Sequence, residues 1–253
     1  MISMNDLKRI SAKEDIPQAT IEKDYVITVA LNEIAKTKLA ENLVFKGGTA
    51  IKKIYFEKAR FSEDLDFTVV NKTPKKEIIS MLSNTFAEKE VQGVHFEEII
   101  QESTSEGLKA SLKFNFLLSH PQRIRFDFSF RENLFLMPKS LNIIESYGLN
   151  TIEIHVMDLQ EIFAEKMHAL GSRSASRDLY DIWFLFENNV HLDKWLVEKK
   201  FAYYNEKLNT SQIIENIKNL QQAWGSDLTR LIKKIKSHKE ISRIVEAKIN
   251  TIF

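Results

Sequence analysis

Two segments of the sequence, DLDFTVV (64–70) and RIRFDFSFR (123–131), alternate polar and apolar residues over the length of one β-strand. Successive side chains of a strand point to opposite faces, so such a segment buries one face and leaves the other in water. The apolar residues of both segments are therefore predicted to face a core. Their aspartates, Asp64, Asp66 and Asp127, are predicted to lie on the polar face.

These aspartates suit a divalent cation. Two carboxylates that point to the same side of one strand can hold an ion between them, and Asp127 joins Asp64 and Asp66 if its strand pairs beside theirs. Mg²⁺ binds one or two carboxylates and completes its octahedron with water and phosphate oxygens. Three carboxylates suit two-metal phosphoryl transfer. The predicted metal is Mg²⁺, with Mn²⁺ as the alternative.

A purely structural explanation of the aspartates competes with this one. Polar residues on the exposed face of a strand are common, and for Asp127 taken alone this explanation is favoured. The pair Asp64 and Asp66 is more informative, because aspartate is disfavoured in strands. Neighbouring like charges also repel unless something positive lies between them.

A glycine pair precedes the first of these strands. Gly47 and Gly48 follow a short apolar strand, LVFK (43–46), and open a predicted helix, AIKKIYF (50–56). Backbone N–H groups at such a turn can bind a phosphate, and the helix dipole adds to the attraction. Thr49 either contributes its hydroxyl or caps the helix. The spacing of a P-loop is absent, and a plain structural turn explains the pair equally well.

A lysine interrupts an apolar stripe in the later part of the chain. The segment EIFAEKMHAL (161–170) has helical spacing, and Lys166 lies on a stripe with Phe163, Met167 and Leu170. A lysine in such a stripe either extends to water along its aliphatic chain or finds an anion. A triphosphate would serve as that anion.

The next predicted helix, within RSASRDLYDIWFLF (173–186), carries Asp178 and Asp181 three residues apart. One explanation gives at least one of them a role at a site. The other makes Asp178 a complement to the helix dipole and pairs Asp181 with Arg177, while Ser176 is the predicted N-cap.

The order of elements predicts an α+β (mixed α/β) protein. The first 155 residues mix helices with five predicted strands, and the rest is almost wholly helical. Cysteine is absent, which excludes disulfides and cysteine nucleophiles. The six histidines lack the spacing of a zinc site, and no G-x-S-x-G segment suggests a serine hydrolase. No apolar run approaches the roughly 20 residues of a membrane span, so the expected location is the cytoplasm.

The motifs KGGTAIKK, RFSEDLDF, EIFAEKMHAL and RDLYDIWFL occur in this order, with IEKDYVITVAL near the start. Together they resemble the AbiEii-type nucleotidyltransferase toxins of bacterial type IV toxin–antitoxin and abortive-infection systems. The resemblance covers most of residues 20–190. The glycine pair and D-x-D alone would indicate only the broader DNA polymerase β-like nucleotidyltransferase superfamily. The later helical motifs narrow the resemblance to the AbiEii-type toxins.

The resemblance implies a nucleotidyltransferase-like catalytic lobe with a small mixed sheet over residues 1–157. A mostly helical lobe over 158–253 would complete the nucleotide site and contribute RNA contacts. The implied reaction is Mg²⁺-dependent transfer of NMP from an NTP to an RNA acceptor, with the tRNA 3′ end expected, which blocks translation. A cognate antitoxin is the implied protein partner, and no membrane association is expected.

The resemblance also implies a role for each candidate residue. Gly47, Gly48 and Thr49 would hold the triphosphate, and Asp64 and Asp66 would bind the metal. Asp127 looks like the third carboxylate and the general base, Lys166 would contact the nucleotide, and Asp178 and Asp181 match the late acidic motif. Apart from the resemblance, Ser62 is expected beside the nucleotide site because it lies two residues before Asp64. Two alternatives remain open. One is a catalytically silent or NTP-sensing module that acts through protein contacts, and the other is a transferase with a protein target.

Overall fold

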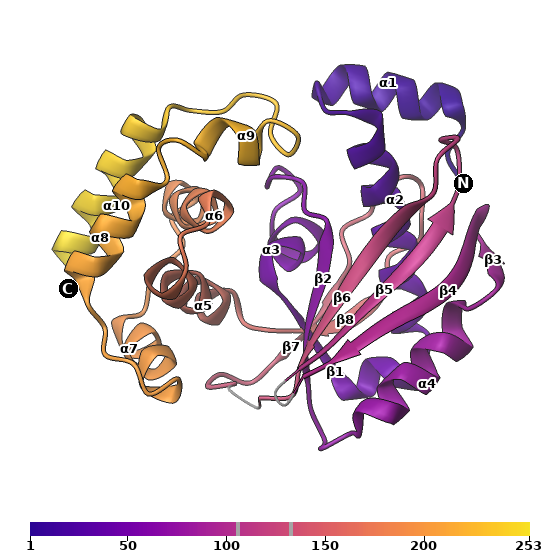
Figure 1. The fold of residues 1–253 in the computed structure, drawn as a ribbon, viewed down its shortest axis with the longest axis horizontal. Coiled ribbons are helices and arrows are strands. Elements are labelled where there is room, and N and C mark those ends of the chain that lie inside the picture. Colours follow the sequence, from indigo (N-terminus) through magenta and orange to yellow (C-terminus); the bar gives the residue numbers. More distant parts are fainter. Residues whose placement is uncertain (105–106, 132–133) are drawn as a thin grey trace. The chain divides into compact units, whose positions relative to one another are not determined.

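The computed structural model describes residues 1–104, 107–131 and 134–253, which form two compact units. The first unit comprises Met1–Glu132 and Pro138–Met157, and the second comprises Asn133–Met137 and Asp158–Phe253 (Figure 1). The chain therefore enters the second unit briefly before it returns to the first. Whether lobes 1–157 and 158–253 behave as separate folding domains stays a prediction, because compactness does not test it.

The first unit is built on one mixed sheet. Its strands are β1 Leu43–Lys46, β2 Asp64–Val69, β3 Lys89–Val91, β4 Val94–Ser103, β5 Gly107–Asn115, β6 Gln122–Ser129, β7 Lys139–Asn142 and β8 Glu153–Val156. They lie in the order β3-β4-β5-β6-β2-β1-β8-β7. The pairs β2–β6 and β1–β8 are parallel, and the others are antiparallel.

The first unit also contains helices, and α4 packs on the apolar face of this sheet. They are α1 Met4–Glu14, α2 Gln18–Ala35, the 3₁₀ helix η1 Lys38–Asn42, α3 Gly47–Ala50, the π-helix η2 Ile51–Tyr55 and α4 Lys75–Phe86. Phe86 on α4 packs against Phe96 on β4 and Phe126 on β6, with ring centroids 5.0 and 6.4 Å apart. Phe67 of β2 stacks on Phe128 of β6 at 5.7 Å. Because these rings fix the alternation of β2 and β6, the polar residues of both strands share the other face.

A buried ion pair lies behind the glycine turn. Lys53 on η2 contacts Asp24 on α2 with Nζ 2.7 Å from Oδ2, and both side chains are 4% exposed. The ammonium also donates to the hydroxyl of Thr28 at 2.8 Å, and the hydroxyl of Tyr147 donates to Asp24 at 2.6 Å. Burial, together with the charge of Asp24, raises the pKa of Tyr147 well above its ordinary value. This network ties α2 to the helix that follows Gly47 and Gly48.

We expect Lys53→Met to lower the free energy of unfolding by about 3 kcal/mol or more, because it leaves the Asp24 carboxylate buried without its cation. The matched control is Lys36→Met, since Lys36 pairs with Glu33 at 2.5 Å but is 50% exposed. Exposed pairs contribute about 1 kcal/mol or less. Urea unfolding measures both changes, and equal losses would contradict the assignment of Lys53 to the core.

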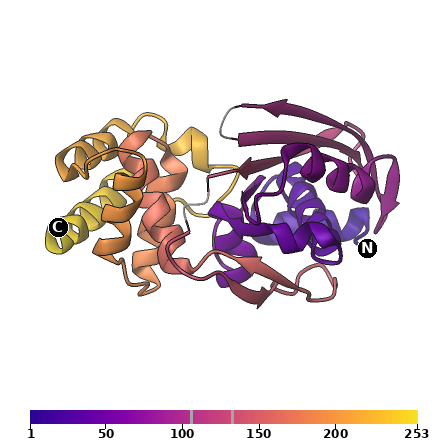
Figure 2. The same ribbon diagram turned by 90° about the horizontal axis from the view of Figure 1, so that it is seen from below.

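The second unit contains only helices among its described residues (Figure 2). They are α5 Leu159–Ser172, α6 Ser176–Glu187, α7 Lys194–Tyr203, α8 Thr210–Asn219, α9 Trp224–Leu228 and α10 His238–Ile252. Asp158 caps α5 by accepting the backbone N–H of Gln160 at 2.8 Å. No helix in the described ranges is long and apolar enough to cross a membrane.

A second buried ion pair anchors the short segment at 134–137 to this unit. Lys200 on α7 lies 2.7 Å from the carboxylate of Glu161 on α5, and neither side chain is exposed. Lys200 also lies 3.2 Å from Glu165. The two oxygens of Glu161 accept the backbone N–H groups of Phe135 and Leu136 at 2.8 Å each. The carboxylate therefore joins three parts of the unit.

The structure differs from the predicted elements at several points. The helix after the glycine pair begins at Gly47 and continues as a π-helix, three residues earlier than expected. Ser176 is the first residue of α6 and not its N-cap, because its hydroxyl donates to Asp227 at 2.7 Å. The sheet has eight strands and not five, since β3, β4 and β7 were not predicted. A bulge between Phe96 and Ile99 interrupts the alternation of β4, which explains why β4 was not predicted.

Candidate functional site

One row of register partners crosses five strands on the polar face of the sheet. Lys46 on β1 pairs with Asp66 on β2, and Asp66 pairs with Asp127 on β6. Beyond Asp127 the row continues to Lys109 on β5 and Glu102 on β4. Register partners on neighbouring strands point to the same face, with their backbones about 5 Å apart. The strand of Asp127 therefore pairs directly beside that of Asp66.

Asp64 lies at the start of β2, one step along the same face. Its register partner on β6 is Arg125, whereas that of Asp66 is Asp127. All three aspartates are partly exposed. In the described part of the chain, no group of three His, Cys, Asp or Glu side chains is arranged to hold a metal ion.

The residues present nevertheless fit a divalent cation whose coordination shell is completed by substrate oxygens. Asp66 and Asp127 supply hard oxygen ligands on one face, and Mg²⁺ needs only one or two carboxylates from the protein. Asp64 lies close enough along the strand to contribute from the same side. The assignment of these three residues as metal ligands stays a prediction.

Gly47 lies directly against the carboxylate of Asp66. The φ angle of Gly47 is +76°, which favours glycine, and a Cβ built on it would lie 2.2 Å from Oδ2 of Asp66. Only a residue without a side chain leaves room for the carboxylate in this position. The glycine turn and the acidic strand, 19 residues apart, thus form one continuous surface.

Thr49 links the turn to the same strand. Its side chain is buried, with 1% exposed, and its hydroxyl donates a hydrogen bond to the backbone oxygen of Asp64. The hydroxyl hydrogen is used in this bond, so Thr49 positions the start of β2. A role of Gly47, Gly48 and Thr49 in holding a triphosphate would rest on their backbone N–H groups, and it stays a prediction.

Ser62 lies in the loop that precedes β2 and is 8% exposed. The loop is held by Lys52, whose ammonium donates to the backbone oxygens of Glu57 and Ala59 at 3.0 and 3.1 Å. The same ammonium lies 4.1 Å from the ring centroid of Phe61, and burial lowers the pKa of Lys52. Ser62 is thus part of a packed loop, and its contact with a nucleotide stays a prediction.

Lys166 and the two late aspartates form a cluster within the second unit. The ammonium of Lys166 lies 2.8 Å from Oδ1 of Asp178 and 2.8 Å from Oδ2 of Asp181. Arg173 reaches Asp178 from the other side at 3.2 Å. The two aspartates are 2% and 3% exposed, and Lys166 is 9% exposed. Of the two outcomes left open for Lys166, the structure shows pairing with anions, and both carboxylates come from the next helix, α6.

Sequence reasoning missed three cations near these residues. Lys46 is the register partner of Asp66, Lys109 is that of Asp127, and Lys53 forms the buried pair behind the turn. The alternation in GLKASLKFN (107–115) was a usable signal for Lys109, because it places the lysine on the polar face of a strand. Nothing in the sequence indicates its partner across the sheet.

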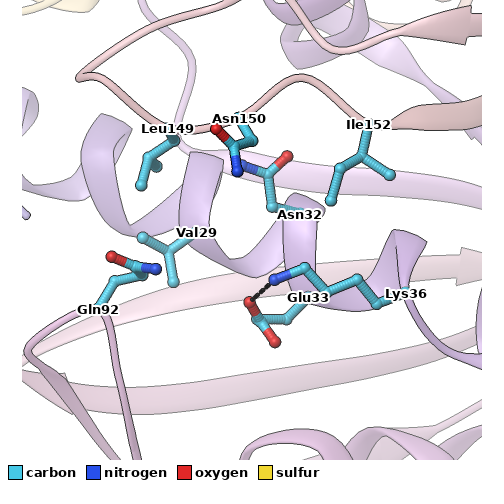
Figure 3. Close-up of a pocket in the computed structure, with 8 residues that line it drawn as sticks. All are labelled: Val29, Asn32, Glu33, Lys36, Gln92, Leu149, Asn150 and Ile152. Carbon is cyan, nitrogen blue, oxygen red and sulfur yellow. Dashed lines mark hydrogen bonds and ion pairs between the residues drawn. The ribbon is translucent and has the colours of Figure 1, made fainter.

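Two pockets of the first unit differ in volume and in the residues that line them. One, of about 170 Å³, includes Asp127 and is lined by Thr104, Gly107, Lys109, Asp127, Ser129 and Arg131. The other, of about 80 Å³, is lined by Val29, Asn32, Glu33, Lys36, Gln92, Leu149, Asn150 and Ile152 (Figure 3). Small-molecule sites usually measure about 300 Å³ or more, so the second pocket is too small for a nucleotide. A larger hollow of about 330 Å³ beside α4 contains none of the candidate residues.

Comparison with known proteins agrees with this arrangement. Residues 29–247 match the family described as nucleotidyl transferase AbiEii toxin, type IV toxin–antitoxin system. The match extends well beyond residue 190, where the recognisable motifs end. No curated protein matches the sequence.

Among solved structures, the fold is similar to that of MenT4, a nucleotidyltransferase toxin from Mycobacterium tuberculosis H37Rv. The TM-score is 0.72 at 18% sequence identity, covering 100% of this chain and 91% of that one. At this identity the similarity concerns the fold, and it confirms the mixed α and β class. Because the family match spans most of the sequence, the chain belongs to the AbiEii family of type IV nucleotidyltransferase toxins, enzymes that use an NTP and are paired with an antitoxin.

Proposed function

We propose that the protein transfers NMP from an NTP to the 3′ end of an RNA, with tRNA as the acceptor, in a Mg²⁺-dependent reaction in the cytoplasm. The single observation that carries this proposal is the pairing of Asp66 with Asp127, with Gly47 against the Asp66 carboxylate. Residues 1–157 are assigned to catalysis. Residues 158–253 are assigned to nucleotide binding through Lys166, Asp178 and Asp181.

Each residue of the first unit has a defined task in this reaction. Asp64 and Asp66 bind the divalent cation, which when bound neutralises charge on the phosphate oxygens. The backbone N–H groups of Gly47 and Gly48 hold the triphosphate. Asp127 accepts the proton of the acceptor hydroxyl. The acceptor oxygen bonds to the α-phosphorus, the bond from that phosphorus to the bridging oxygen breaks, and pyrophosphate leaves.

The test is a transfer assay with each of the four α-labelled NTPs, Mg²⁺ or Mn²⁺, and total tRNA. Label should enter RNA with release of one pyrophosphate per nucleotide, and tRNA with a periodate-oxidised 3′ end should accept none. Label on protein would replace the RNA acceptor with a protein target. Retained NTP binding without any transfer would replace the enzyme reaction with NTP sensing.

Lys166→Met is expected to lower the transfer rate about tenfold. The substitution removes the proposed contact of the ammonium with the nucleotide, and it also leaves Asp178 and Asp181 without the cation that neutralises them. The variant should also lose stability, since two buried carboxylates remain. Lys200→Met is the matched control, because Lys200 is likewise buried between two carboxylates of the same unit.

The transfer rate per folded molecule separates a role of Lys166 in nucleotide binding from a role in stability, provided that both variants are assayed below their melting temperatures. Lys200→Met should retain the wild-type rate. A rate that falls equally in the two variants would assign Lys166 to packing and remove it from the nucleotide site.

A further inference from the structure

We propose that the polar face of β5 and β6 beside Asp127 binds the terminal phosphodiester of the acceptor strand, with Lys109 as its central contact. This inference rests on the proposed transfer function and names the surface that its second substrate occupies. Figure 1 shows β5 and β6 as neighbouring strands, with β2 on the far side of β6.

The order of residues across the sheet assigns a side to each substrate. In nucleotidyl transfer the attacking and leaving oxygens lie roughly in line on opposite sides of the phosphorus. Gly47 lies against Asp66, so the triphosphate side of the row is that of β1 and β2. The acceptor must then approach from the other side of Asp127. The residue there is Lys109, its register partner on β5.

The face around Lys109 has the charge that a phosphodiester requires. Lys109, Arg123 and Arg125 are all exposed on β5 and β6. Among the described residues, none of these three has an ion-pair partner within 4.0 Å, whereas the nearby Lys113 is paired with Glu97. Lys109 has Asp127 and Glu102 as its register partners but forms an ion pair with neither, so its ammonium is available to replace a counterion of a phosphate.

A pocket at this position has the size and lining for one phosphate. Its volume is about 170 Å³, and its polar lining combines Lys109 and Arg131 with the hydroxyls of Thr104 and Ser129. This is less than a whole nucleotide needs, but it suits a phosphate with part of its ribose. Asp127 lies in the same lining. When the terminal phosphodiester is bound here, the 3′ hydroxyl of the same nucleotide would therefore lie within reach of the proposed base.

The next row on this face suits a nucleobase. Asp64 pairs with Arg125, Arg125 with Ser111, and Ser111 with Ile100 on β4. Ile100 is 48% exposed, which leaves an apolar surface near a planar guanidinium. Single-stranded RNA bases stack on such groups.

The experiment measures RNA affinity and transfer kinetics of Lys109→Glu and Lys109→Gln. Fluorescence anisotropy with a single-stranded RNA that ends in a free 3′ hydroxyl gives Kd directly, without any need for catalysis. We expect Kd and KM for RNA to rise about tenfold in Lys109→Glu, with a smaller rise in Lys109→Gln. The slope of log Kd against log salt should fall by about 1. NTP binding and kcat at saturating RNA should stay within about threefold.

The matched control is Lys76→Glu, which makes the same charge change at an exposed lysine on α4. That helix packs on the opposite, apolar face of the sheet through Phe86. RNA binding should be unchanged in this variant.

The outcomes separate this inference from the proposed function. Wild-type transfer to RNA with an unchanged Kd in Lys109→Glu would overturn the surface and leave the enzyme reaction intact. RNA binding that depends on Lys109 without any transfer would support the surface and overturn the reaction. Transfer to a protein, without RNA binding, would overturn both.

Discussion

Asp66→Asn is expected to lower the rate of nucleotidyl transfer by at least about 10³-fold while the chain remains folded. Asp66 is the residue at which the parts of the candidate site meet, with Gly47 against its carboxylate and Asp127 as its register partner. The amide has nearly the same shape but no charge, so it no longer binds the divalent cation. Losing charge stabilisation at a reacting phosphate typically costs several kcal/mol of activation free energy.

Initial rates of α-labelled NMP transfer to tRNA measure this effect, and thermal unfolding reports whether the fold persists. Glu90→Gln is the matched control, because it makes the same chemical change at an exposed residue of β3, at the edge of the same sheet. Its rate should equal that of the wild type. An Asp66→Asn variant that keeps more than a tenth of wild-type activity would remove Asp66 from the metal site.

The sequence could predict that the aspartates lie on the polar face of their strands, but it could not predict their register partners on the adjacent strand. Alternation in 64–70 and 123–131 fixes which side chains share a face of each strand. It does not identify the adjacent strand, since β2 and β6 are joined through α4, β3, β4 and β5. Only the parallel register brings Asp127 level with Asp66 and leaves Asp64 opposite Arg125.

Buried and paired cations were the hardest residues to predict. Lys53 occurs in a segment with another lysine, Lys52, and spacing alone does not distinguish a core ion pair from a solvated side chain. For Lys166 the apolar stripe left two outcomes open, extension to water or pairing with an anion, and the structure shows an ion pair. Its partners come from the following helix, where the spacing of Asp178 and Asp181 is equally compatible with capping or surface pairing.

Gly47→Ala is expected to lower the transfer rate by about 10²-fold or more, through two separate effects. The first is backbone strain, because a residue with a Cβ at φ +76° costs about 1 to 2 kcal/mol. The second is displacement of the Asp66 carboxylate, since the added Cβ would lie 2.2 Å from Oδ2. A shift of about 1 Å in a catalytic group can alone cost about 10²-fold in rate.

Gly148→Ala separates these two effects. Its φ is +67°, so the alanine carries a similar backbone strain, but its Cβ would have no other atom within 4 Å. We expect both variants to lose about 1 to 2 kcal/mol of stability, while only Gly47→Ala loses transfer. Equal rates in the two variants would mean that the contact between Gly47 and Asp66 does not matter for the reaction. Loss of NTP binding in Gly47→Ala alone would instead assign the turn to holding the triphosphate, since backbone N–H groups of such a turn can bind a phosphate.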